Sequence, residues 1–119
     1  MAIKSEARPD EFFDELEVMP PQTREKYLNQ KLSETVAHAY RYAPAVRSIF
    51  AEAKISPTQI RTVKDLEKLP ITRKTDLIQL QKKHPPYGGF LTIPPEDIDR
   101  IFISPGPIYE PIHHAGIKW

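Results

Sequence analysis

The sequence has no cysteine among its 119 residues, and it has no excess of charge of either sign. Disulfide bonds, zinc–thiolate sites, iron–sulfur clusters and thiol nucleophiles are therefore excluded within these residues. The 17 lysines and arginines nearly balance the 16 aspartates and glutamates, which leaves a formal net charge of +1. A balance this even argues against strong overall electrostatic attraction to nucleic acid or to an anionic membrane.

Long hydrophobic runs are also missing. No apolar stretch approaches the length that a membrane-spanning helix needs. The sequence turns polar from Lys4 onward, so it begins without the apolar stretch of a signal peptide. We therefore expect neither a membrane nor a nucleic acid as partner, and we expect a cytoplasmic location.

Proline is abundant where glycine is scarce, with 13 prolines against 4 glycines. Because proline fixes φ and removes a backbone donor, we expect short segments joined by stiff turns. The fold class that we predict is α/β, rich in helices, with short strands toward the C-terminus. Residues 1–119 would form one unit, helical over 10–83 and made of turns and strands over 84–119.

The longest predicted helix covers residues 23–43, where apolar side chains recur every three or four positions. Pro44 suits the first turn of a second helix, and we expect Tyr40 of the first helix to pack against Phe50 of the second. Shorter helical segments are predicted at 10–18, 57–60, 62–66, 72–80 and 94–97. Thr62 and Asp65 have the spacing of a capping box at the start of 62–66, and Thr72 is the expected cap of 72–80.

The clearest strand is 100–103, which is β-branched and aromatic without a helical period. A second short strand is predicted at 90–93, and a proline-rich loop at 104–111. Two short strands do not make a stable sheet in water. We therefore expect the sheet partners to lie in a continuation beyond Trp119 or in another chain.

Residues 65–77, DLEKLPITRKTDL, are similar to the "DL…LP.T.K.DL" signature of phenylacetate–CoA ligase-like enzymes. The resemblance continues in the same order through 86–94 and 96–101, and it covers roughly residues 13–111. The chain thus resembles the N-terminal portion of an adenylate-forming (AMP-dependent synthetase/ligase) enzyme.

This resemblance implies the chemistry of a complete enzyme. ATP, Mg²⁺ and coenzyme A would be its cofactors, and a carboxylic acid, aromatic acids included, would be activated as an acyl-adenylate and passed to coenzyme A. The remainder of the ligase, or a partner chain, would complete the sheet, and a homo-oligomer is a further option. We expect the fragment alone to be inactive and to bind no cofactor, because the family's adenine-binding and catalytic-lysine motifs are absent from it.

The family's nucleotide loop reads Ser-Ser-Gly-Thr-Thr-Gly-Lys-Pro after a strand, and its matching positions here are 104–111. The agreeing residues, which are the candidate nucleotide-loop residues, are Ser104, Gly106 and Pro111. Pro105 and Pro107 have no N–H to donate, and Glu110 places a negative charge where the motif has a positive one. The segment is therefore either an altered nucleotide loop or a proline-rich turn that merely ends a strand.

No catalytic residue and no metal site is predicted, because the sequence has neither a helical His-Glu-x-x-His motif nor a nucleophile elbow. The alternative function is a non-catalytic helical interaction module, or subunit, that retains the ligase N-terminal scaffold. Pro107 and Glu110, which differ from the residues of the family motif, are consistent with that alternative.

Overall fold

The structure is a computed structural model that describes residues 13–113. Its elements, in chain order, are α1 (Pro21–Tyr42), α2 (Pro44–Ala53), η1 (Pro57–Gln59), η2 (Val63–Lys68), α3 (Lys74–Lys83), η3 (Pro95–Asp97), β1 (Arg100–Ser104) and β2 (Ile108–Ile112). Helices followed by short strands confirm the predicted fold class. None of the helices within residues 13–113 combines the length and the apolar character that crossing a membrane requires.

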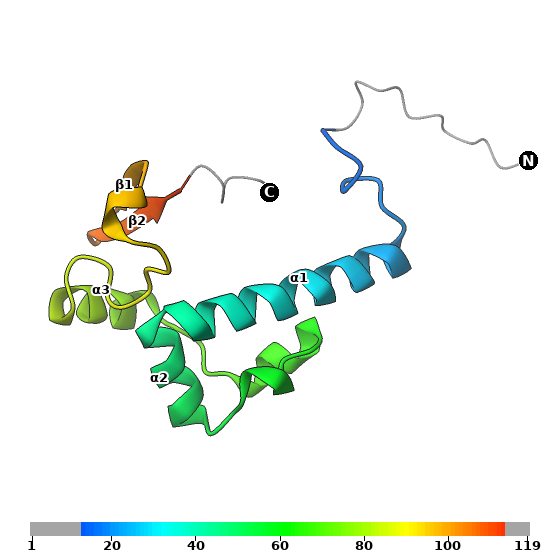
Figure 1. Cartoon of the computed structure of the whole chain (residues 1–119), viewed down its shortest axis with the longest axis horizontal. Helices are drawn as coiled ribbons and strands as arrows, with labels where there is room; N and C mark the ends of the chain where they lie inside the picture. Colours follow the sequence, from blue (N-terminus) through cyan, green and yellow to red (C-terminus); the bar gives the residue numbers. More distant parts are fainter. Residues whose placement is uncertain (1–12, 114–119) are drawn as a thin grey trace, which may run out of the picture.

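The long helix α1 is the spine of the molecule (Figure 1). The helix α2 folds back from the C-terminal end of α1, and the 3-10 turns η1 and η2 run beside α1. The helix α3 and the β-hairpin lie beyond that same end of α1. Among residues 13–113 the buried hydrophobic side chains are Val36, Ala43, Phe50, Ile60 and Ile108. The described part of the chain therefore buries few apolar side chains.

The core is small and lies where α1, α2 and η1 meet. Phe50 and Ile60 are 3% and 2% exposed, and they cluster with Val36 of α1. The rings of Tyr40 and Phe50 meet edge to face with their centroids 5.5 Å apart, which confirms the predicted contact. Pro44 is the first residue of α2, as its fixed φ favours.

The turn η2 is fixed at its start by Asp65, as the predicted Thr62–Asp65 capping box requires. The Asp65 carboxylate accepts backbone N–H groups from Arg61 and Thr62 at 2.9 and 3.0 Å. It also lies 3.1 Å from Lys68 Nζ. The Val63 N–H donates to Asn29 Oδ1 of α1 at 3.1 Å, so η2 is tied to the spine.

These contacts make Asp65 an acid-sensitive anchor. The Arg61 N–H, then the Thr62 N–H and Lys68, hold the pKa of Asp65 well below its ordinary value of 3.8. Because the folded-state pKa is the lower one, the stabilisation is fully present above pH 3.8 and is lost as the pH falls through the folded-state pKa. We expect Asp65→Asn to flatten the acid limb of a plot of unfolding free energy against pH. The same change at the exposed Asp97 is the control, and an unaltered acid limb in Asp65→Asn would contradict this assignment.

Two of the predicted helical segments differ in the structure. Residues 13–18, the described part of the predicted helix 10–18, form turns. The Glu17 carboxylate accepts a hydrogen bond from the Phe13 N–H at 2.6 Å. The Asp14 carboxylate accepts one from the Leu16 N–H at 2.9 Å. Acidic side chains that bond to nearby N–H groups in this way compete with helix formation. The helix α3 is preceded by Arg73 as its N-cap residue rather than by Thr72.

The prediction of a strand at 90–93 is wrong. The prediction of a loop at 104–111 holds only for residues 105–107. Residues 90–93 are not in a strand, and β1 pairs instead with β2 in an antiparallel hairpin. In its register Ser104 lies opposite Ile108 and Ile101 lies opposite Pro111. A proline without an N–H is tolerated there because a two-stranded hairpin consists of edge strands.

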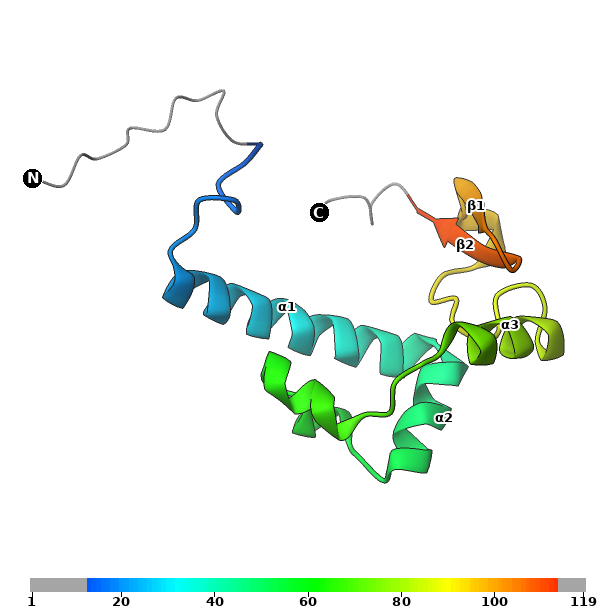
Figure 2. The ribbon, with the colours of Figure 1, turned by 180° about the vertical axis from the view of Figure 1, so that it is seen from behind.

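The hairpin stands away from the core (Figure 2). Its β2 strand contacts α3, while the large apolar side chains of β1 remain open to solvent. Ile101 and Ile103 on one face are 50% and 65% exposed, and Phe102 on the other is 51% exposed. Both faces of β1 are therefore uncovered by the described residues of this chain.

Candidate functional site

The candidate site is the turn of the hairpin, because it holds two of the three predicted site residues. Ser104 ends β1, residues 105–107 form the turn, and Ile108 begins β2. Gly106 has a φ of 153°, which residues with a side chain rarely adopt. A Cβ there would lie 3.1 Å from Cδ1 of Ile78 on α3. The turn therefore needs glycine for its backbone and for its close approach to α3.

A buried glutamine clamps β2 to α3. Gln81 is 7% exposed; its Nε2 donates to the Tyr109 carbonyl, and its Oε1 accepts the Tyr109 N–H, both at 2.9 Å. One side-chain amide thus satisfies both backbone groups of a strand residue. The sequence analysis does not single out Gln81. The available signal is its spacing, because it falls four residues after Leu77 and three after Ile78, on the apolar side of the helix.

The predicted site residue Ser104 is hydrogen-bonded to Glu110, one of the residues that differ from the family motif. Ser104 Oγ donates a hydrogen bond to Oε2 of Glu110. The register places Glu110 opposite Phe102, which is two residues before Ser104. The side chains of Ser104 and Glu110 therefore lie on the same face of the hairpin. The third predicted residue, Pro111, is opposite Ile101 near the other end of β2. The structure therefore does not bring Ser104, Gly106 and Pro111 together.

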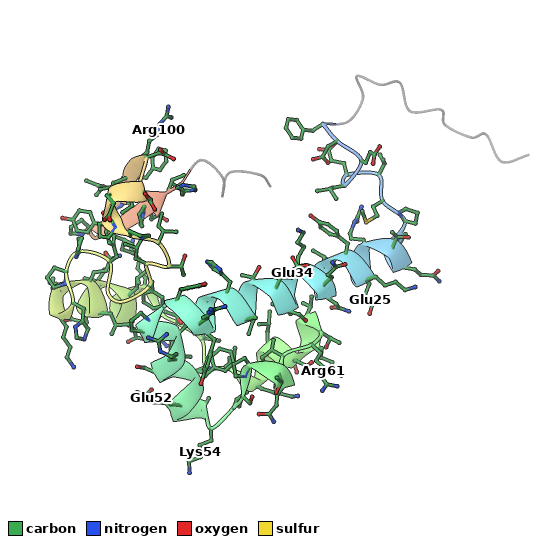
Figure 3. All side chains as sticks on the ribbon, in the orientation of Figure 1. Glu25, Glu34, Glu52, Lys54, Arg61 and Arg100 are labelled. Carbon is green, nitrogen blue, oxygen red and sulfur yellow. The ribbon has the colours of Figure 1, made fainter. Side chains whose placement is uncertain are left out.

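Pro111 instead lines a groove of about 780 Å³ between α3, the 87–93 segment and β2. Most of its lining is apolar, including Leu77, Phe90, Leu91, Ile93 and Ile108. Its polar lining includes His38, Gln81, Glu110 and His113. Ser104 and Gly106 are not among the lining residues. Figure 3 shows the side chains crowding between α3 and the hairpin, with Arg100 pointing away from the body of the molecule.

The turn does not fit the phosphates of ATP as it stands. Phosphate loops bind with several backbone N–H groups, hydroxyls and a cation. Here Pro105 and Pro107 have no N–H, the Ser104 hydroxyl already donates to Glu110, and the Glu110 carboxylate repels an anion. Within residues 13–113 no group of three or more histidines, aspartates or glutamates is arranged to hold a metal ion. Of the two adjacent histidines at 113 and 114, His114 lies outside the described residues, so this statement does not cover it.

No family model matches the chain. It is 33% identical to a phenylacetate–coenzyme A ligase of Thermus thermophilus over 97 residues, which are 82% of this chain and 21% of that protein. It is 35% identical to the phenylacetate–coenzyme A ligase of Escherichia coli over 82 residues, which are 69% of this chain and 18% of that protein.

The comparison of folds also finds a CoA ligase. The structure superposes on crystal structures of a 2-hydroxyisobutyryl-CoA ligase with a TM-score of 0.75 and 31% identity, over 82% of this chain and 21% of that one. One of these structures is in the postadenylation state in complex with 2-HIB-AMP, and another holds 2-HIB-AMP and CoA.

The described fold is thus that of a segment of the adenylate-forming CoA ligases. Within this class, the chain is a homologue of the phenylacetate–CoA ligases, as the motif at 65–77 indicated. It spans about a fifth of the length of the relatives that it matches.

Proposed function

We propose that this chain is the N-terminal portion of an ATP-dependent acid–CoA ligase. The complete enzyme would activate a carboxylic acid as its acyl-adenylate and then transfer the acyl group to coenzyme A, with ATP, Mg²⁺ and coenzyme A as cofactors. The observation that carries the proposal is the 33% identity to a phenylacetate–coenzyme A ligase over 97 residues. An aromatic acid is the substrate class that this relative's name favours, and the cytoplasm is the location that we propose.

The open hairpin supports this proposal. Both faces of β1 expose large apolar side chains, and a two-stranded hairpin is marginal in water without further strands or a covering layer. We propose that the remainder of the ligase covers β1 and supplies the missing strands. The portion made of residues 1–119 would be inactive alone, because the adenine-binding and catalytic-lysine motifs of the family are absent from it.

The test is acid-dependent AMP release by the protein that the complete reading frame encodes. The purified protein is incubated with ATP, Mg²⁺, coenzyme A and a panel of aryl and short aliphatic acids, and AMP is quantified by chromatography. The proposal predicts AMP with at least one acid and none when the acid is omitted. A folded protein that forms no AMP with any acid of the panel would refute it.

A non-catalytic subunit is the second candidate function, and one specific observation favours it. The Ser104 hydroxyl of the turn is hydrogen-bonded to the Glu110 carboxylate. Two prolines stand where a phosphate loop needs N–H donors. Such a subunit would keep the ligase scaffold and bind a partner through the exposed β1. A reading frame that stops after Trp119, together with stable binding to a ligase-like partner chain, would favour this candidate.

A further inference from the structure

The outer edge of β2 is closed by one side chain and one proline. Hydrogen bonds between antiparallel strands alternate, so every second residue of an edge strand turns its N–H and C=O away from its partner strand. In β2 these residues are Tyr109, whose N–H and C=O both bond to Gln81 at 2.9 Å, and Pro111, which has no N–H. The outward positions of β2 therefore offer no free N–H group to a further strand.

The outer edge of β1 is open. Ile103 lies opposite Tyr109 and Ile101 lies opposite Pro111, so the backbone groups of both isoleucines also point away from the partner strand. Within residues 13–113 the sheet consists of β1 and β2 alone, so no described strand lies beside this edge. An edge whose backbone groups are free and whose side chains are apolar is a template for a further strand.

We infer that the outer edge of β1 is the strand-addition surface of this chain, and that Gln81 makes the addition one-sided by closing β2. The occupant is an extended, apolar strand from the remainder of the ligase, so its identity rests on the proposed function. The chain spans 21% of the relative that it matches, so most of the ligase is available to supply that strand. Gln81 is a positioning residue, because it does not touch the added strand but fixes which edge receives it.

The first test changes the number of open edges in the full chain. A chain with one open edge pairs with one other copy at most, whereas a chain with two open edges adds copies at both ends without closing. Gln81→Leu removes both hydrogen bonds to Tyr109. Because unpaired N–H and C=O groups are costly at a part-buried site, they bond to another strand instead. We expect sedimentation velocity to find species larger than a dimer for Gln81→Leu and none for the unchanged chain.

A second change separates the closure of the edge from a loss of stability. In Gln81→Leu/Tyr109→Pro the new side chain removes the exposed N–H, as Pro111 already does two residues later, and we expect the large species to disappear. A chain that associates because its fold is weakened would gain nothing from that proline. Gln79→Leu, the same change at an exposed position of α3, is the matched control and should sediment like the unchanged chain. A Gln81→Leu chain that stays at a dimer or below, or large species that persist in the double variant, would overturn the closure by Gln81.

The second test measures hydrogen exchange at the Ile101 and Ile103 amides in the protein that the complete reading frame encodes. An added strand accepts hydrogen bonds from both N–H groups, so we expect exchange at least about tenfold slower there than in residues 1–119. Selective isoleucine labelling resolves these amides by NMR. Equally fast exchange in the two proteins would overturn the assignment of β1 as the edge that receives a strand.

The outcomes separate the inference from the proposed function. Slow exchange at both isoleucines, in a complete protein that releases no AMP with any acid, would refute the ligase proposal and support strand addition at β1. AMP release by a complete protein in which both amides exchange fast would support the ligase proposal and overturn the inference.

Discussion

Replacing Phe50 with alanine is expected to lower the free energy of unfolding by about 3–5 kcal/mol, the usual cost of truncating a buried phenylalanine. Phe50 is 3% exposed and joins α2 to Tyr40 of α1 in a small core. Small native domains are stable by only about 5–15 kcal/mol, so this loss would remove a large part of the stability of the chain. Urea unfolding followed by circular dichroism measures the effect.

Phe13→Ala is the matched control, because Phe13 is 84% exposed. Removing the same side chain from an exposed site should change the unfolding free energy by less than about 0.5 kcal/mol. Equal losses for the two variants, or a loss below about 1 kcal/mol for Phe50→Ala, would show that the core lies elsewhere.

The double variant Ile101→Lys/Ile103→Lys is expected to abolish docking of the chain onto the rest of a ligase while leaving its own fold intact. Fully burying an isoleucine side chain contributes about 1.5–3 kcal/mol, and Ile101 and Ile103 are still 50% and 65% exposed. The covering proposed for β1 would therefore lose about 1.7–3.5 kcal/mol of apolar burial, or about twentyfold to several hundredfold in Kd, and it would also have to desolvate two ammonium groups. The partner is the Thermus thermophilus relative from which the matching segment has been deleted, and calorimetry measures the Kd.

Val63→Lys is the control for this variant, since Val63 is also 50% exposed but belongs to η2 on the other side of the molecule (Figure 1). It should bind the partner like the unchanged chain. Undiminished binding by the double lysine variant would mean that β1 is not part of the docking surface.

The helical half of the fold follows from local rules, and the sequence predicts it well. The three- and four-residue spacing of apolar side chains locates α1, Pro44 locates the start of α2, and the Thr62–Asp65 pair locates η2. Even the packing of Tyr40 on Phe50 follows, because two helices joined by one residue must form a corner. In these elements the local preference and the tertiary packing agree.

The strand β1 follows from its β-branched and aromatic residues, as predicted, but β2 and the site do not follow from local rules. The prolines at 105, 107 and 111 indicate a loop, yet residues 108–112 pair with β1 because α3 holds them from outside. That hold depends on the contact of Gln81 with Tyr109, 28 positions away in the sequence, which no local pattern encodes. The pairing of Ser104 with Glu110 likewise depends on the strand register.

We propose that this chain is a ligase segment whose hairpin is covered by the rest of a ligase. Sedimentation of the unchanged chain mixed with the truncated Thermus thermophilus relative tests it most directly. The account predicts a one-to-one complex that the double lysine variant does not form. Two folded species that sediment separately at concentrations of about 100 μM, far above a Kd typical of stable complexes, would contradict it.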